Sequence, residues 1–224
     1  MIAPRSCYVS PIDIPNIDSS EPNGNLSGNA TKLDNFREGY ERDVLIKCLG
    51  YPLYKELQDS LEVLENATEQ TVKASADQKW KDLVNGKTYQ IDGVNVIWDG
   101  LIFKEGVYNR SLIAQYVYYH FMDDNESQNT TTGRQSEKTK NSNKVSVAPS
   151  AVKAWRKFFE MTVGVYNTPI HYYEGGRLAG IDYFGSDNGQ RSLYQFIDDM
   201  NTITPKTYDN WMPKLWENKS ISGL

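Results

Sequence analysis

Few residues of this chain have the types and spacing that catalysis or metal binding requires. The sequence contains two histidines, His120 and His171. Asp123 and Asp124 follow His120 closely, but this spacing is not that of a zinc site or of a carboxylate-bridged metal site. A cationic imidazole near the end of a helix complements the helix dipole. We therefore expect His120 to be a helix-end residue rather than a metal ligand, and nothing in the sequence assigns a role to His171.

The acid–base and nucleophile patterns of common enzyme classes are missing as well. Asp123–Asp124 and Asp198–Asp199 are neighbours in sequence, and neighbouring side chains on a helix point about 100° apart, so neither pair converges on one atom. The chain has no Gly-x-Ser-x-Gly motif, and Gly175–Gly176 lacks the lysine of a phosphate-binding loop. Cys48 falls on a predicted buried stripe, and Cys7 has no companion. We expect no enzymatic activity, no metal and no cofactor.

One basic segment has the charge to contact phosphate groups. It belongs to a polar stretch, residues 125–144, and its four cations stand against a single carboxylate, Glu137. On a mobile loop these cations would contact DNA transiently; the alternative is a solvated linker that charge keeps soluble. The four cations are Arg134, Lys138, Lys140 and Lys144.

Composition excludes several other classes of protein. The net charge is −5, whereas a dedicated nucleic-acid-binding protein usually carries a strong basic patch. The chain has no run of 18 apolar residues, so we expect no membrane span. The first five residues lack the basic and apolar segments of a secretory signal peptide. Two cysteines cannot build a disulfide scaffold.

Aromatic residues are abundant, and this points to protein interfaces. The chain has 15 tyrosines and 5 tryptophans, side chains that are enriched where proteins meet because a polar tip accompanies a large apolar body. The alternative is a set of half-buried residues within the fold. Apolar residues near both ends of the chain are the candidate partner interface: Ile12, Ile14, Tyr208, Trp211 and Trp216.

Hydrophobic periodicity predicts a mainly α-helical fold, an antiparallel helical bundle with one small β-hairpin, a long polar loop and extended terminal arms. Apolar residues recur at three- and four-residue steps, and Gly50 separates the first two helices, which we expect to form an antiparallel pair. Asp92–Gly93 between β-forming residues predicts the hairpin over 87–98. The predicted helices cover residues 31–49, a stretch from Tyr51 to Leu64, 78–84, 109–122, a stretch from Pro149 to Val163, and 192–200.

The same pattern divides the chain into three parts. Residues 1–30 are rich in Pro, Asn, Ser and Gly and predict an extended arm with no packed core of its own. Residues 31–163 form the helical core, with the hairpin at 87–98 and the polar loop at 123–147. Residues 164–224 combine an irregular insertion, a helix and an aromatic C-terminal tail.

The order of these elements resembles a known family. A helix with Asn35-Phe36-Arg37-Glu38-Gly39-Tyr40-Glu41-Arg42-Asp43-Val44-Leu45 leads to Leu49-Gly50-Tyr51-Pro52-Leu53-Tyr54-Lys55-Glu56-Leu57. Then follow Trp80, Leu83 and Gly86, the hairpin, Tyr116-Val117-Tyr118-Tyr119, Thr132-Gly133, and Ser150 with Trp155. Over residues 31–163 this resembles the head–tail connector, or neck adaptor ring, proteins of tailed bacteriophages, and most of all the ring proteins of crAss-like phages of gut Bacteroidetes.

The resemblance implies a structural virion protein made in the host cytoplasm and located at the neck. Such adaptors are mainly helical, form a ring of commonly twelve identical subunits on the portal protein, and extend the channel for DNA. The partners implied are the portal, identical subunits, other neck or tail proteins and, transiently, passing double-stranded DNA. The arm 1–30, the loop 123–147 and the aromatic tail would make these contacts, whereas the irregular 164–190 stretch departs from simpler adaptors.

Two other classes stay open. One is another tail component, such as a tail terminator, which would bind the tail tube instead of the portal. The other is a small hydrolase that uses Asp and Tyr, which would need a pocket with converging carboxylates.

Overall fold

The computed structural model describes residues 1–9, 12–15, 17, 28–64, 69–91, 93–126, 128–130, 133–135, 148–164, 172–174, 177–179 and 189–214. Within these ranges the chain forms six α-helices, a 3₁₀ helix and five two-stranded antiparallel hairpins. Helices contain most of the regular structure, as the periodicity predicts. The prediction of a single hairpin is wrong.

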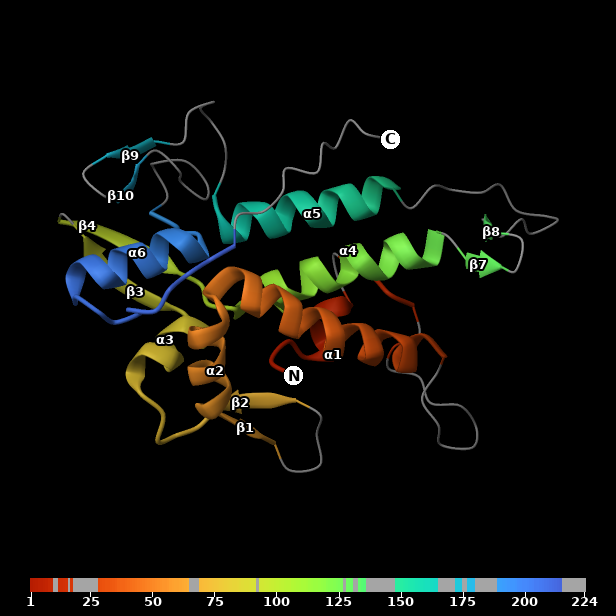
Figure 1. Ribbon diagram of the computed structural model, residues 1–224, viewed down its shortest axis with the longest axis horizontal. Coiled ribbons are helices and arrows are strands. Elements are labelled where there is room, and N and C mark those ends of the chain that lie inside the picture. Colours follow the sequence, from red (N-terminus) through yellow and green to blue (C-terminus); the bar gives the residue numbers. More distant parts are fainter. Residues whose placement is uncertain are drawn as a thin grey trace.

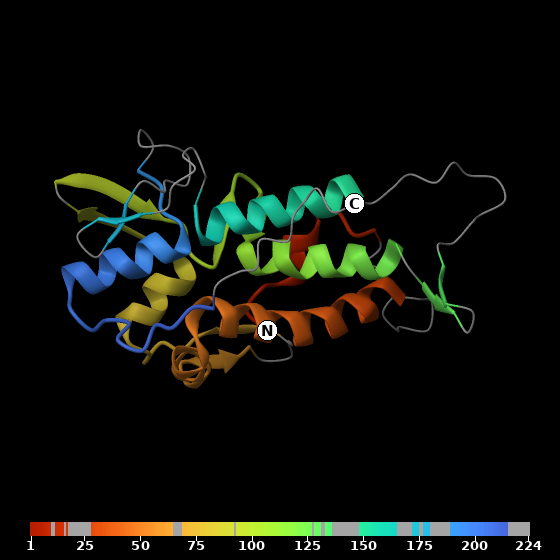
Figure 2. The same ribbon diagram turned by 45° about the horizontal axis from the view of Figure 1, so that its top comes forward.

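Three helices lie side by side and form the centre of the molecule (Figures 1 and 2). They are α1 (Gly28–Leu49), α4 (Leu112–Glu126) and α5 (Ala148–Thr162). Each runs opposite to its neighbour, and α4 lies in the middle. Because α4 has neighbours on both sides, every residue from Leu112 to Tyr118 is buried. No helix in the described ranges is long and apolar enough to cross a membrane.

A second packing group contains the predicted hairpin. Helices α3 (Gln78–Asn85) and α6 (Leu193–Ile203) pack beside β3 (Lys87–Ile91) and β4 (Val94–Trp98) at one end of the molecule (Figure 1). Trp98 stacks on Phe196 with ring centroids 5.4 Å apart. Ser192 and Gln195 form a reciprocal capping box at the start of α6, which fixes where that helix begins.

The junction between α1 and α2 (Tyr51–Asp59) differs from the predicted antiparallel helix pair. Gly50 has φ +83° and ψ 156°, a combination that only glycine adopts readily. Helix α2 therefore leaves α1 at a steep angle (Figures 1 and 2). It ends at Asp59, and Leu61, which we expected on its apolar stripe, begins strand β1.

Four further hairpins complete the described structure. Their strands have three or four residues each, too few for a period-two pattern to separate them from loops. One lies inside the predicted polar loop and another inside the predicted irregular stretch. The four are β1–β2 (Leu61–Val63, Gln70–Val72), β5–β6 (Ile102–Glu105, Tyr108–Ser111), β7–β8 (Gln128–Thr130, Gly133–Gln135) and β9–β10 (Tyr172–Glu174, Arg177–Ala179).

The described part of the N-terminal arm is packed and not free. It contains the 3₁₀ helix η1 (Arg5–Tyr8). Ile2, Ala3, Cys7 and Tyr8 are buried in the same core as α1 and α4. These arm residues are stabilised by contacts with segments distant in sequence, so they belong to the core that α1 and α4 form and not to a core of the arm itself.

Candidate interaction surface

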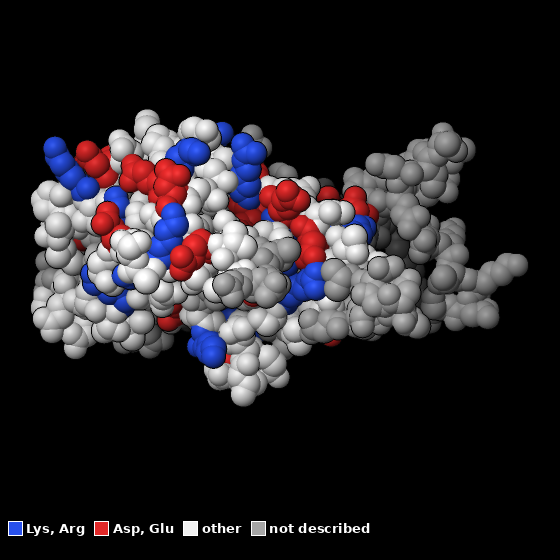
Figure 3. All heavy atoms as spheres, turned by 90° about the horizontal axis from the view of Figure 1, so that it is seen from below, with Lys and Arg blue, Asp and Glu red and all other residues white. Residues whose placement is uncertain are grey.

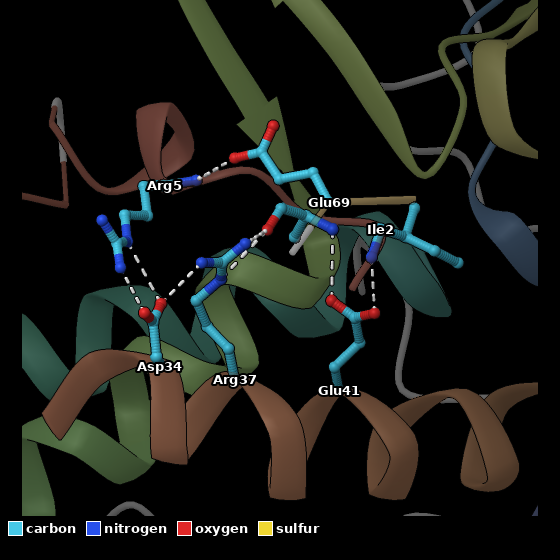
Figure 4. A network of polar contacts seen from close by, with 7 residues as sticks. Ile2, Arg5, Asp34, Arg37, Glu41 and Glu69 are labelled. Atoms are coloured by element: carbon cyan, nitrogen blue, oxygen red, sulfur yellow. Dashed lines mark hydrogen bonds and ion pairs between the residues drawn. The ribbon is translucent and has the colours of Figure 1, made fainter. Parts of the chain in front are cut away.

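Glu41 of α1 holds the backbone of the first residues of the chain. Its two carboxylate oxygens accept hydrogen bonds from the amide nitrogens of Ile2 (2.6 Å) and Ala3 (3.1 Å), as Figure 4 shows. Burial raises the pKa of the Glu41 carboxyl, against the effect of these hydrogen bonds. The carboxylate is thus the hydrogen-bond acceptor that these buried N–H groups require.

Arg37 completes the attachment one helical turn earlier. Its guanidinium donates to the carbonyl of Ala3 from Nε (3.2 Å) and Nη2 (2.7 Å), and from Nη1 to Asp34 (2.8 Å). Arg5 of the arm also pairs with Asp34 (Figure 4). Burial acts to raise the pKa of the Asp34 carboxyl, but the hydrogen bonds from Arg5 and Arg37 outweigh it and lower that pKa. These charged groups hold the arm on α1.

The positions of Arg37 and Glu41 in the sequence indicate that both are buried, although charged residues are usually exposed. Both fall on one helical stripe with Leu33, Val44 and Cys48, all of which are buried. Opposite charges four residues apart on such a stripe indicate buried polar contacts, because unpaired charges are not tolerated there.

Ile12 and Ile14, two of the predicted interface residues, belong to the core of this chain. Their side chains are 6% and 3% exposed. The amide of Ile14 also donates to the carbonyl of Tyr8 (3.1 Å), which turns the arm back on itself. The prediction of a partner surface is corrected for both residues, because the arm folds onto its own chain.

The aromatic tail also packs inward where it is described. Tyr208 is 1% exposed, and its hydroxyl donates to the carbonyl of Lys79 (2.7 Å). Trp211 is partly buried, and its indole nitrogen donates to the carbonyl of Cys48 (2.9 Å). Tyr208 is therefore not a partner contact in this fold, and Trp211 has a structural role. Trp216 lies outside the described residues.

The tail caps the end of α1. The last carbonyls of a helix have no partner within the helix. Here the carbonyls of residues 47–49 accept from the amide of Lys214 (2.9 Å), from the indole of Trp211 and from the amide of Met212 (3.3 Å), respectively. The segment 211–214 is thus a strap that satisfies the C-terminus of α1, and we call it the C-terminal strap.

The predicted DNA-contacting residues are not placed by the structure. Arg134 lies in β8, but its side chain is not among the described atoms. Lys138, Lys140 and Lys144 lie outside the described residues. Their contact with DNA stays a prediction.

A polar cluster between α1 and α4 contains His120. Asp43 accepts from Tyr116 Oη (2.5 Å) and from Lys47 Nζ (2.7 Å), and His120 stacks on Tyr40 with ring centroids 4.1 Å apart. Burial and the contact with Asp43 raise the pKa of the Tyr116 hydroxyl, so this phenol does not titrate near neutral pH. The described residues contain no group of three His, Cys, Asp or Glu that could hold a metal ion. The cluster joins two helices.

A groove of about 710 Å³ lies between α5 and the hairpin β5–β6. Its buried lining residues are largely apolar, and its exposed ones are largely charged. The buried ones include Ile12, Tyr118, Ala154 and Met161, and the exposed ones include Lys104, Glu105, Lys153 and Arg156. Such a lining suits a partner with both apolar and charged groups.

Exposed apolar side chains gather on hairpins. Ten large apolar side chains are exposed among the described residues, and six of them lie on or directly beside β1–β2, β3–β4 and β5–β6. The most exposed is Val107, at 89%, in the turn of β5–β6. The other five are Val63, Leu64, Val94, Ile97 and Tyr108. Each of these three hairpins therefore exposes two large apolar side chains.

Charged groups on the face at the bottom of Figure 1 are mixed in sign. Figure 3 shows this face from below, with acidic and basic side chains interspersed and no extended patch of one sign. Electrostatic recognition on this face is therefore local.

Comparison of the chain with protein-family models, with curated protein sequences and with solved structures gives no match.

Proposed function

We propose that this chain is a structural virion protein that forms an oligomeric ring of twelve subunits between the portal and the tail of a tailed bacteriophage. The ring would extend the channel through which DNA passes. Its partners would be the portal, identical subunits and other neck or tail proteins.

The segments that resemble neck adaptor proteins support this proposal because they belong to one packed unit. Leu49, Gly50 and Leu53 lie at the junction of α1 and α2. Tyr116 of α4 packs on Phe158 of α5, with ring centroids 5.1 Å apart. Residues that carry the resemblance are therefore also residues that fix the relative positions of the helices.

The observation that carries the proposal is that each of the three hairpins β1–β2, β3–β4 and β5–β6 exposes two large apolar side chains. A monomer gains nothing from this arrangement, whereas an assembly protein needs several distinct contact sites. A closed ring requires two different faces on each subunit, because its contacts are head-to-tail.

The negative net charge also suits a channel through which DNA must pass without binding tightly. Each chain carries a net charge of −5, so a ring has a strong negative field that disfavours tight binding of DNA. The basic residues of the 123–147 loop would make only transient contacts with phosphates. Replacing Arg134, Lys138, Lys140 and Lys144 together with Ala should slow DNA packaging or ejection; unchanged rates would remove the loop from the mechanism.

The direct test is a choice between two partners. The purified chain is incubated with immobilised portal protein and, separately, with tail-tube protein of the same phage. We expect retention on the portal. Retention on the tail tube alone would instead support a tail terminator or another tail-interface protein.

A further inference from the structure

We infer that the groove between α5 and β5–β6 receives the acidic hairpin β1–β2 of a second copy of this chain. This inference rests on the proposed ring and names the contact between its subunits. The argument uses the charge of the groove, the chemistry of the hairpin and their positions in the fold.

Three cations of the groove have no carboxylate partner among the described residues. Arg110 pairs with Glu105 (2.8 Å), and Lys157 with Glu160 (3.7 Å). None of the described carboxylates forms an ion pair with the other three basic groups there. Those three are Lys104, Lys153 and Arg156, all exposed.

The hairpin β1–β2 presents the complementary groups. Asp59, at the end of α2, and Glu62 are exposed, and neither carboxylate forms an ion pair with a described residue. Val63 and Leu64 beside them are also exposed, at 63% and 46%. Lys73, at the base of the hairpin, donates its ammonium group to the backbone carbonyl of Asp59 (2.6 Å). An exposed segment that combines carboxylates with apolar side chains matches a groove with a buried apolar lining and exposed cations.

Helix α5, which forms one wall of the groove, lies on the opposite side of the molecule from hairpin β1–β2. Helix α5 and hairpin β1–β2 are separated by α1 and α4 in both ribbon views (Figures 1 and 2). A chain therefore cannot place its own hairpin in its own groove. Complementary surfaces on opposite sides produce head-to-tail contacts, which close into a ring when the rotation between subunits permits.

Reciprocal charge reversal tests the contact without the portal. The groove variant carries Lys153→Glu and Arg156→Glu, and the hairpin variant carries Asp59→Lys and Glu62→Lys. Lys206→Glu and Asp209→Lys are the matched controls, since both residues are exposed on the loop that follows α6. Circular dichroism establishes that every variant is folded, and the neutral pair Lys153→Gln and Glu62→Gln replaces any variant that is not. Sedimentation velocity measures self-association over a concentration series.

We expect the wild-type chain and both controls to self-associate. Each double variant alone should associate at least about tenfold more weakly than the wild type. An equimolar mixture of the two variants should recover association, because each reversed surface meets a complementary one on the other variant. A monomeric wild-type chain, variants that associate as the wild type does, or a mixture that fails to recover would each overturn the inference. The inference would also be overturned if the groove variant bound duplex DNA more weakly than the wild type but self-associated as the wild type does. Portal binding is measured separately, so a ring on the portal with a different subunit contact is distinguished from failure of the proposed function.

Discussion

Two glycine-to-alanine substitutions in and beside the same helix should have opposite effects on stability. Gly50 has φ +83°, and a Cβ there would lie 2.8 Å from the carbonyl oxygen of Met212. The backbone conformation costs about 1–3 kcal/mol for a residue other than glycine. Displacing the C-terminal strap loses a hydrogen bond worth about 1 kcal/mol. Gly50→Ala should therefore lower the free energy of unfolding by about 2–4 kcal/mol.

Gly39 is the matched control. It lies within α1, and a Cβ there meets nothing within 4 Å. Gly39→Ala should raise the free energy of unfolding by about 0.5–1 kcal/mol, because alanine favours the helix. Urea unfolding followed by circular dichroism measures both values, and hydrogen exchange at the Met212 amide reports the strap, which should exchange faster in Gly50→Ala. If Gly50→Ala were as stable as the wild type, the junction and the strap would not be packed as described.

Three further predictions concern buried groups. Glu41→Gln should lower the free energy of unfolding in urea by about 1–3 kcal/mol, because an amide nitrogen cannot accept from the backbone N–H groups that the carboxylate binds. The control Glu38→Gln, at an exposed position, should change that free energy by less than about 0.5 kcal/mol, and equal effects of the two variants would refute the role of Glu41. Cys7 and Cys48 are buried, and burial raises the pKa of the Cys7 thiol to about 12 and that of Cys48 as well, so iodoacetamide at pH 8 should alkylate both only in urea, and rapid labelling of the native chain would contradict their burial. The pKa of Asp34 is lowered in the folded state, so its contribution to stability is present above its unfolded pKa and disappears as the pH falls through the folded value; the difference in unfolding free energy between wild type and Asp34→Asn should shrink from pH 7 to pH 3, and a constant difference would exclude that linkage.

Local periodicity is sufficient to predict the helices. The apolar stripe over residues 31–49 and the Asp92–Gly93 signal depend only on neighbouring residues, and the structure has α1 and the hairpin β3–β4 where they predict a helix and a hairpin. Leu61 shows the limit of this reasoning: it continues the leucine spacing of α2, but α2 ends at Asp59 and Leu61 pairs with Val72 in a hairpin. Pairing with the next strand, β2, overrides the leucine spacing of α2.

The candidate site was less predictable than the fold for the same reason. Tyr208 and Ile12 have the chemistry of interface residues, and only contacts with residues far along the chain make them core residues. The groove combines β5–β6, α5 and Ile12 of the N-terminal arm, three segments that are far apart in the chain, so residue types alone do not assemble it. What the sequence does predict is the class of the surface, one suited to proteins rather than to a substrate.

The most direct test of the proposed function is negative-stain electron microscopy of the purified chain, alone and mixed with the portal protein of its phage. We expect rings stacked coaxially on the portal, and their rotational symmetry gives the subunit number. Single chains that ignore the portal at every ratio would contradict a head–tail connector.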